Sequence, residues 1–296
     1  MLTRFAPSPT GELHLGHAYS AALAHAAVRE AGGRFRIRID DIDGSRSRED
    51  HVAAALADLA WLGLDWDGDP VRQSRHLGDY AAALGHLRGR GLVYPCFCTR
   101  ADIVQSLTAP HGPAGAVYPG TCRHLPAAER ERRLADEPHC WRLDMARAAA
   151  LAGPLYWEEA GSPEVSASPS EEGGRHMVLA APVAHGDVVL ARKDAPASYH
   201  LASTLDDAAM GVTHVIRGAD LIASTDVHRL LQALLGLATP VYRHHALVCG
   251  PDGRRLAKRD AAASLAALRG AGVDGRALAK DLRAGRLPAG YSLQIP

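Results

Sequence analysis

Two histidines near the start of the chain stand where an apolar segment gives way to a helix. His14 and His17 follow Pro7 and Pro9, which disfavour helix, and precede an alanine-rich run that ends at residues 32–33. The start of a helix presents free N–H groups and a partial positive charge, to which imidazoles add further donors. The pattern predicts a phosphate-binding junction, although a proline-bounded loop with two surface histidines fits the bare spacing equally well.

A basic loop near the other end of the chain is a second candidate for phosphate binding. The glycine-containing turn at 250–253 is followed by four cations, Arg254, Arg255, Lys258 and Arg259. Such a loop can close over a polyphosphate, and a solvated charge run is the alternative interpretation.

Two further features offer charge to a small substrate. Asp40, in the acidic run 39–43, stands at the end of a predicted strand, where a carboxylate can hold an ammonium group or a metal, or form a solvated turn. Arg217 follows a β-branched segment, and its planar guanidinium can form two parallel hydrogen bonds with a carboxylate. A structural ion pair is the alternative for an isolated arginine of this kind.

Three cysteines lie in a stretch rich in glycine and proline. Cys96, Cys98 and Cys122 offer three thiolates, and zinc prefers four ligands in a tetrahedron. Chance occurrence of reduced cysteines is the alternative. The chemistry leaves the fourth ligand open among His111, Tyr118 and His124. Cys140 and Cys249 lie outside this cluster and are predicted to be buried apolar side chains.

The elements that must position these residues alternate along the chain. Residues 34–40 alternate polar and apolar and predict a strand, and 47–63 predicts a helix with a capping box formed by Ser47 and Asp50. Another helix is predicted at 225–235, capped by Ser224 and ended by Gly236. Alternating strands and helices predict an α/β fold with a Rossmann-like, doubly wound parallel sheet, whose ligands bind beyond the carboxyl ends of the strands.

The composition narrows the class of protein. The 296 residues are 47% hydrophobic, with 33 basic and 33 acidic side chains, which excludes a uniformly basic surface but not a local basic patch. No apolar run approaches the roughly 20 residues of a membrane span, and the N-terminus lacks the pattern of a signal peptide. Five cysteines, an odd number, argue against a disulfide framework. We expect a cytoplasmic protein with no membrane association.

Residues 4–17 read RFAPSPTGELHLGH, which resembles the HIGH signature of class I aminoacyl-tRNA synthetases in its glutamyl-branch form. The basic loop stands where that family has its KMSKS loop. Arg255, Ala257 and Arg259 replace the first lysine, first serine and last serine, while Lys258 keeps the second lysine. The resemblance implies that His14, His17 and Lys258 bind ATP and stabilise the reacting phosphates, with Mg²⁺ sharing that task.

The resemblance also implies a glutamate site. Residues 198–221 are similar to the family segment YHLANVVDDHxMGITHVIRG, and Asp40 stands where the family has a glutamate that contacts the α-amino group. Asp206 and Asp207 are expected to shape the pocket. The residues implied in glutamate binding are Arg4, Phe5, Ala6, Pro7, Ser8, Asp40, Tyr199 and Arg217.

The spacing CxC…YxxxC resembles that of the glutamyl-queuosine synthetases within this branch, and this resemblance favours Tyr118 as the fourth ligand. It implies one structural Zn²⁺ per chain, held by Cys96, Cys98, Tyr118 and Cys122. Only 36 residues follow Asp260, where glutamyl-tRNA synthetases carry a large helical anticodon-binding region. We therefore expect a monomer with a catalytic domain at 1–93 and 126–260, a zinc-binding insertion at 94–125 and a short helical extension at 261–296.

The implied reaction has two steps. ATP and L-glutamate give glutamyl-adenylate and pyrophosphate, and glutamate is then transferred to the queuosine base in the anticodon loop of tRNA(Asp). No residue pattern identifies a general base for the transfer. Two alternatives stay open: a truncated glutamyl-tRNA synthetase that charges a tRNA 3′ end, and a catalytically weak paralogue that binds RNA.

Overall fold

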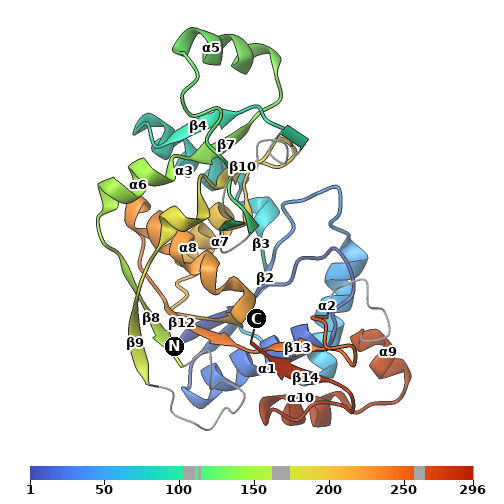
Figure 1. The fold of residues 1–296 in the computed structure, drawn as a ribbon. Helices are drawn as coiled ribbons and strands as arrows, with labels where there is room; N and C mark the ends of the chain where they lie inside the picture. Colours follow the sequence, from blue (N-terminus) through green and yellow to red (C-terminus); the bar gives the residue numbers. More distant parts are fainter. Residues whose placement is uncertain (100, 103–110, 113–114, 162–173, 257–263, 296) are drawn as a thin grey trace.

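The computed structural model describes residues 1–296 except 100, 103–110, 113–114, 162–173, 257–263 and 296. A largely parallel sheet lies at its centre, in two parts (Figure 1). One part is wholly parallel and consists, in order, of β1 (Leu2–Phe5), β2 (Arg34–Ile39) and β3 (Val71–Arg72). The other has only its last strand antiparallel and consists of β11 (His214–Gly218), β12 (Val241–His245), β8 (Tyr156–Ala160) and β9 (Arg175–Leu179). The predicted α/β fold with a parallel sheet is confirmed.

The two parts of the sheet meet at β1 and β11. The backbone N–H of Thr213 donates to the carbonyl of Leu2 (3.0 Å), and the Leu2 N–H donates to the Thr213 hydroxyl (2.9 Å). From this seam the sheet extends in one direction through β2 to β3 and in the other through β12 to β8 and β9. The direction of the strand order therefore reverses at β1 and β11. Ligands of open parallel sheets bind at such a reversal, beyond the carboxyl ends of the strands.

Helix α1 (Leu15–Glu30) follows β1 and covers the seam. Half of its buried side chains are alanines, which let the helix lie close to the sheet; the buried residues are Leu15, Ala18, Tyr19, Ala21, Ala22, Ala24, His25 and Val28. After the helix ends, the chain turns tightly into β2. A Cβ on Gly33 would lie 2.2 Å from the Met1 carbonyl oxygen, so only glycine fits there.

The remaining helices surround the sheet. Before β12, the last strand of the sheet along the chain, they are α2 (Glu49–Trp61), α3 (Leu77–Gly89), α6 (Met145–Ala152), α7 (Tyr199–Ala209) and α8 (Ile222–Leu235). Toward the C-terminus lie α9 (Leu265–Gly270), α10 (Gly275–Arg283) and the hairpin of β13 (Leu247–Cys249) with β14 (Ser292–Gln294). Within the described residues, no helix is both long enough and apolar enough to cross a membrane.

Two predicted helix starts are wrong. Helix α2 is capped by Arg48 without a side-chain hydrogen bond, because the N–H of Ser47 is engaged in a turn with the Asp43 carbonyl. Helix α8 begins at Ile222, because the 3₁₀ turn Ala219–Leu221 runs directly into it and leaves Ser224 inside the helix. The predicted end is confirmed, since Gly236 adopts a left-handed conformation with φ 66°.

The cysteine-bearing segment forms part of a separate antiparallel unit, at the top of Figure 1. Its sheet consists, in order, of β10 (Val189–Ala191), β7 (Cys140–Leu143) and β4 (Val93–Cys96), with α5 (Ala127–Asp136) and the short strands β5 (His111–Gly112) and β6 (Gly115–Ala116) nearby in the chain. The buried carboxylate of Asp187 ties the unit together by accepting hydrogen bonds from Tyr94, Arg123 and the Met145 N–H. The predicted boundary at residue 125 therefore falls inside this unit, and the domain limits stay a prediction.

Candidate functional site

A cavity of about 390 Å³ opens at the carboxyl ends of β1, β2, β11 and β12. It brings together every described residue for which the sequence implied a role in ATP or glutamate binding: Arg4, Phe5, Ala6, Pro7, Ser8, His14, His17, Asp40, Tyr199 and Arg217. Its size lies in the range of about 300–1,000 Å³ that is common for small-molecule sites. Lys258 lies outside the described residues, although its neighbours Arg255 and Leu256 line the cavity.

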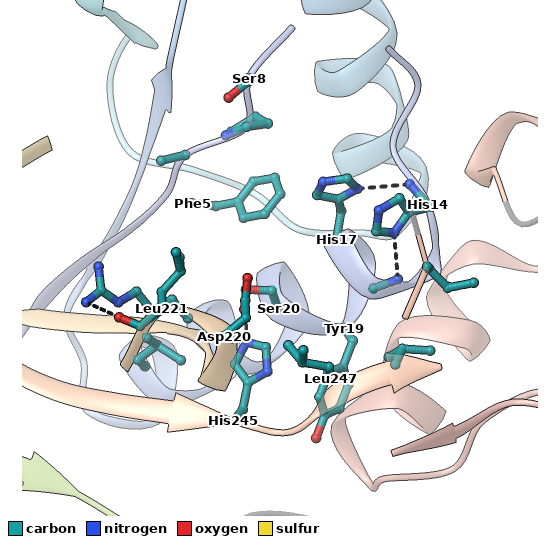
Figure 2. A pocket seen from close by; sticks show the side chains of 18 of the residues that line it. Phe5, Ser8, His14, His17, Tyr19, Ser20, Asp220, Leu221, His245 and Leu247 are labelled. Atoms are coloured by element: carbon teal, nitrogen blue, oxygen red, sulfur yellow. Dashed lines mark hydrogen bonds between the residues drawn. The ribbon is translucent and has the colours of Figure 1, made fainter. Parts of the chain in front are cut away.

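His14 and His17 form the start of α1 and one wall of the cavity (Figure 2). The Nδ1 atom of His14 accepts the N–H of Gly16 (3.2 Å), and Nδ1 of His17 accepts the N–H of His14 (3.1 Å). The rings lie 3.8 Å apart. Because both Nδ1 atoms accept, each neutral ring carries its proton on Nε2. The rings therefore bring donor N–H groups to the cavity wall beside a helix N-terminus, as the binding of a phosphate requires.

Arg217, at the end of β11, supplies a buried positive charge to the same cavity. Its guanidinium donates to the Tyr199 hydroxyl (3.1 Å), the Thr225 hydroxyl (2.7 Å) and the Leu221 carbonyl (3.1 Å). In the described part of the chain no carboxylate lies within 4.0 Å of it. A buried cation held only by neutral groups is suited to an anionic ligand, since its charge is not yet paired.

Asp40 faces the cavity from β2, but its carboxylate is already held by Arg38, which donates to both of its oxygens (2.7 and 3.2 Å). Burial raises the pKa of Asp40, while Arg38 and Arg4 act to lower it. The predicted contact with a substrate ammonium group would thus be made by a carboxylate that also neutralises a buried arginine.

Arg4 is also paired within the protein. It donates to both oxygens of Asp207 (2.8 and 3.1 Å), and Arg38 reaches the same carboxylate at 2.6 Å. Burial raises the pKa of Asp207, but the two guanidinium groups outweigh it and the net shift is downward. Asp207 is not among the residues that line the cavity, but it holds Arg4 and Arg38, which are, and its role in shaping the pocket stays a prediction.

Several cavity residues were missed by the sequence reasoning. Arg38 alternates with apolar residues and so resembles a solvent-facing position, yet its side chain is 1% exposed. His245 accepts the Ser20 hydroxyl at Nε2 (3.0 Å), and Asp220 pairs with Arg255 (2.7 Å) across the cavity mouth. No sequence signal identified these pairs, because their members come from distant segments.

The predicted metal site forms a compact cluster. The sulfur atoms of Cys96, Cys98 and Cys122 lie within 4.8 Å of one another, and the Tyr118 hydroxyl lies 3.3 Å from Cys96 Sγ and 3.5 Å from Cys98 Sγ. His124 is exposed and outside this group, and the side chain of His111 is outside the described part. Cys140 is buried, as predicted. It lies opposite Cys96 in the β4–β7 strand pair, next to the cluster outside which it was predicted to lie.

A parallel sheet with a cavity at its reversal point and two histidines at the start of a helix is consistent with a class I tRNA synthetase, and comparison with known proteins shows that class. The family model described as tRNA synthetases class I (E and Q), catalytic domain, matches residues 1–287. Among solved structures, the chain resembles a glutamate-tRNA synthetase from Elizabethkingia anophelis (TM-score 0.69, 26% identity, covering 88% of this chain and 53% of that one). It thus spans about half the length of that synthetase.

More similar relatives narrow the class. A glutamyl-Q tRNA(Asp) synthetase of Rhodobacter capsulatus is 48% identical over 279 residues, covering 92% of this chain and 96% of that protein. The protein of the same name from Symbiobacterium thermophilum is 44% identical over 280 residues, covering 91% and 81%. The chain belongs to the glutamyl-Q tRNA(Asp) synthetase family.

Proposed function

We propose that this protein activates glutamate with ATP and transfers it to the queuosine base in the anticodon loop of tRNA(Asp). The observation that carries the proposal is the charge arrangement of one cavity. Buried Arg217, without a carboxylate partner among the described residues, faces the space that the His14–His17 wall also borders. The cavity thus offers a cation for a carboxylate and donors for a phosphate, the two groups that adenylate formation joins.

The first step is an in-line displacement. A carboxylate oxygen of glutamate forms a bond to the α-phosphorus of ATP, the bond from that phosphorus to the bridging oxygen breaks, and pyrophosphate leaves. Class I synthetases use ATP with Mg²⁺, which supplies positive charge to the phosphates. This chain's contribution is positioning: Arg217 and Tyr199 orient glutamate, and Nε2–H groups of His14 and His17 stabilise the transition state. We assign Lys258, from the sequence, to the same phosphates.

In the second step a hydroxyl of the queuosine cyclopentene ring attacks the activated carbonyl carbon, AMP leaves, and an ester is formed. The direct experiment measures transfer of labelled glutamate to tRNA(Asp) with and without queuosine. We expect labelling only of the queuosine-containing tRNA. Equal labelling of both would contradict this assignment and support charging of the 3′ end.

A second assay separates an enzyme from a protein that only binds RNA. Pyrophosphate exchange that depends on glutamate and ATP, measured without tRNA, is expected because the donors and the cation already share one cavity. Absence of exchange with or without tRNA would leave only a binding function.

We further propose that the cysteine cluster holds one structural Zn²⁺. Three sulfur atoms and one phenol oxygen match the number of donors of a tetrahedral zinc site. Tyr118 contacts two of the three cysteines, and its hydroxyl also accepts the N–H of Cys122 at 2.9 Å, so it is already held within the cluster. Bound zinc would join β4 to the segment that carries Tyr118 and Cys122.

Replacing Cys98 by serine is expected to reduce bound zinc from about one equivalent to a small fraction of it, because a structural site needs all four donors. The midpoint of thermal unfolding should fall with it. Elemental analysis of the purified protein and differential scanning fluorimetry measure both quantities. Cys249→Ser, a buried cysteine on β13, is the control and should keep its zinc. Full zinc content in the Cys98 variant would contradict the site.

A further inference from the structure

Behind Arg217 lies a buried polar chain that the two proposed steps do not use. The Nε2 atom of His244, on β12, lies 3.2 Å from Arg217 Nε. Its Nδ1 atom lies 2.7 Å from Oε2 of Glu159, on β8, and Oε1 of the same carboxylate accepts the backbone N–H of His244 at 2.8 Å. The side chains of His244 and Glu159 are 0% and 1% exposed. Three neighbouring parallel strands thus link a carboxylate in the core to the guanidinium in the cavity.

The hydrogens in this chain can be assigned from donor and acceptor chemistry. The Nε of an arginine always carries hydrogen, so Nε2 of His244 must accept. Burial and the charge of Arg217 hold the pKa of His244 well below its ordinary value, so the ring carries a single proton. That proton must be on Nδ1, where it is donated to Glu159. Burial raises the pKa of Glu159 to about 7, while the His244 backbone N–H and the charge of Arg217 act to lower it. The geometry selects the ionised form, because a neutral carboxyl group would donate to Nδ1 and leave two N–H groups facing each other at Arg217.

This arrangement orients a cation without pairing it. Arg217 is held by neutral acceptors, namely the imidazoles of His244 and His228, the Tyr199 and Thr225 hydroxyls and the Leu221 carbonyl. The compensating carboxylate stands one imidazole ring further away. A direct ion pair would already balance the charge that attracts a substrate carboxylate, whereas the neutral acceptors leave that charge to the substrate.

We propose that Glu159 is a positioning residue for glutamate binding: it fixes the Nδ1–H tautomer of His244 and, through that ring, the orientation of Arg217. The proposal rests on the proposed function, because it takes Arg217 to bind a carboxylate of glutamate. The carboxylate acts on the tautomer in the same way as the aspartate of a Ser-His-Asp triad, where replacement by asparagine preserves the shape and selects the wrong tautomer.

The test is Glu159→Gln, assayed by tRNA-free pyrophosphate exchange. The amide oxygen must accept the His244 backbone N–H, so the amide NH₂ faces Nδ1 and demands the wrong tautomer. We expect the KM for glutamate to rise about tenfold, equivalent to about 1.4 kcal/mol, with the KM for ATP unchanged. Glu158→Gln is the matched control, since Glu158 lies next in the chain, partly exposed and paired with Arg175 (3.0 Å), and should leave both constants unchanged.

Variants at His244 test whether Glu159 acts through the tautomer of that ring. In a His244→Gln protein, an amide oxygen can face Arg217 whatever residue stands at 159, so Glu159→Gln should raise the glutamate KM there much less than tenfold. His244→Asn, whose amide stands near the Nδ1 position and cannot reach Arg217, should raise that KM by itself and more than His244→Gln does. If Glu159→Gln does not fold, the difference in glutamate KM between His244→Asn and His244→Gln provides the test.

An unchanged glutamate KM in Glu159→Gln, or equal changes in the KM values for glutamate and ATP, would overturn the inference. So would an equal effect of Glu159→Gln in the otherwise unmodified protein and in the His244→Gln background. Exchange by the unmodified protein distinguishes failure of this inference from failure of the proposed function. If the unmodified protein shows no glutamate-dependent exchange, the proposed function fails.

Discussion

Replacing Arg217 by lysine is expected to lower kcat/KM for glutamate by about 10²–10³-fold in the tRNA-free exchange reaction. Truncating one member of a buried, hydrogen-bonded charge pair costs about 2–5 kcal/mol, and each 1.4 kcal/mol is a factor of ten. Lysine keeps the charge but loses the planar fork, so it cannot hold His244, Tyr199 and a substrate carboxylate at once. The KM for ATP should change little, because the phosphate donors belong to α1.

The measurement is pyrophosphate exchange at varied glutamate concentration with saturating ATP, and then at varied ATP concentration with saturating glutamate. Arg132→Lys, an exposed position on α5, is the control for the substitution itself and should behave as the unmodified protein. An Arg217→Lys protein with an unchanged glutamate constant would show that glutamate is bound elsewhere in the cavity.

Replacing His17 by asparagine is expected to lower kcat of adenylate formation by about 10²–10³-fold, the cost of removing one preorganised donor from a developing oxyanion. Asparagine is the informative replacement because its side-chain oxygen stands near the Nδ1 position and can still accept the N–H of His14. It lacks any group at Nε2. The substitution therefore separates the donor from the helix cap, the two functions that the imidazole combines.

Thermal unfolding is the companion measurement. His17→Asn should retain the unfolding midpoint, whereas His17→Ala should lose both the activity and about 1 kcal/mol of stability, the usual cost of a lost cap. If His17→Asn exchanges pyrophosphate at the normal rate, His17 only caps the helix and the phosphate must be bound by other groups.

The parts of the site that are contiguous in sequence were predictable. Pro7, Pro9 and Gly33 act on the backbone of their own segment, so the strand–helix junction and the place of the two histidines follow from local rules. The cysteine cluster was predicted for the same reason, since two of its members are separated by one residue.

Helix starts were less predictable. Ser224 has the chemistry of a cap, yet α8 begins earlier because a preceding 3₁₀ turn supplies the first turn of the helix. The hydroxyl of Thr225 then serves Arg217 rather than the helix end. The preceding 3₁₀ turn thus overrode a capping preference worth only about 1 kcal/mol.

The sequence by itself determined the class of fold, the strand–helix junction with its two histidines and the residue types of the cavity, because strand and helix patterns and their breakers act over short stretches of chain. Only the tertiary structure decided which charged side chains pair with one another. Arg4 and Arg38 share Asp207 across more than 160 residues, and Glu159 reaches Arg217 through His244 on a neighbouring strand. A buried charge must be hydrogen-bonded, and whether its partners are charged or neutral depends on the order and register of strands in the sheet rather than on spacing along the chain.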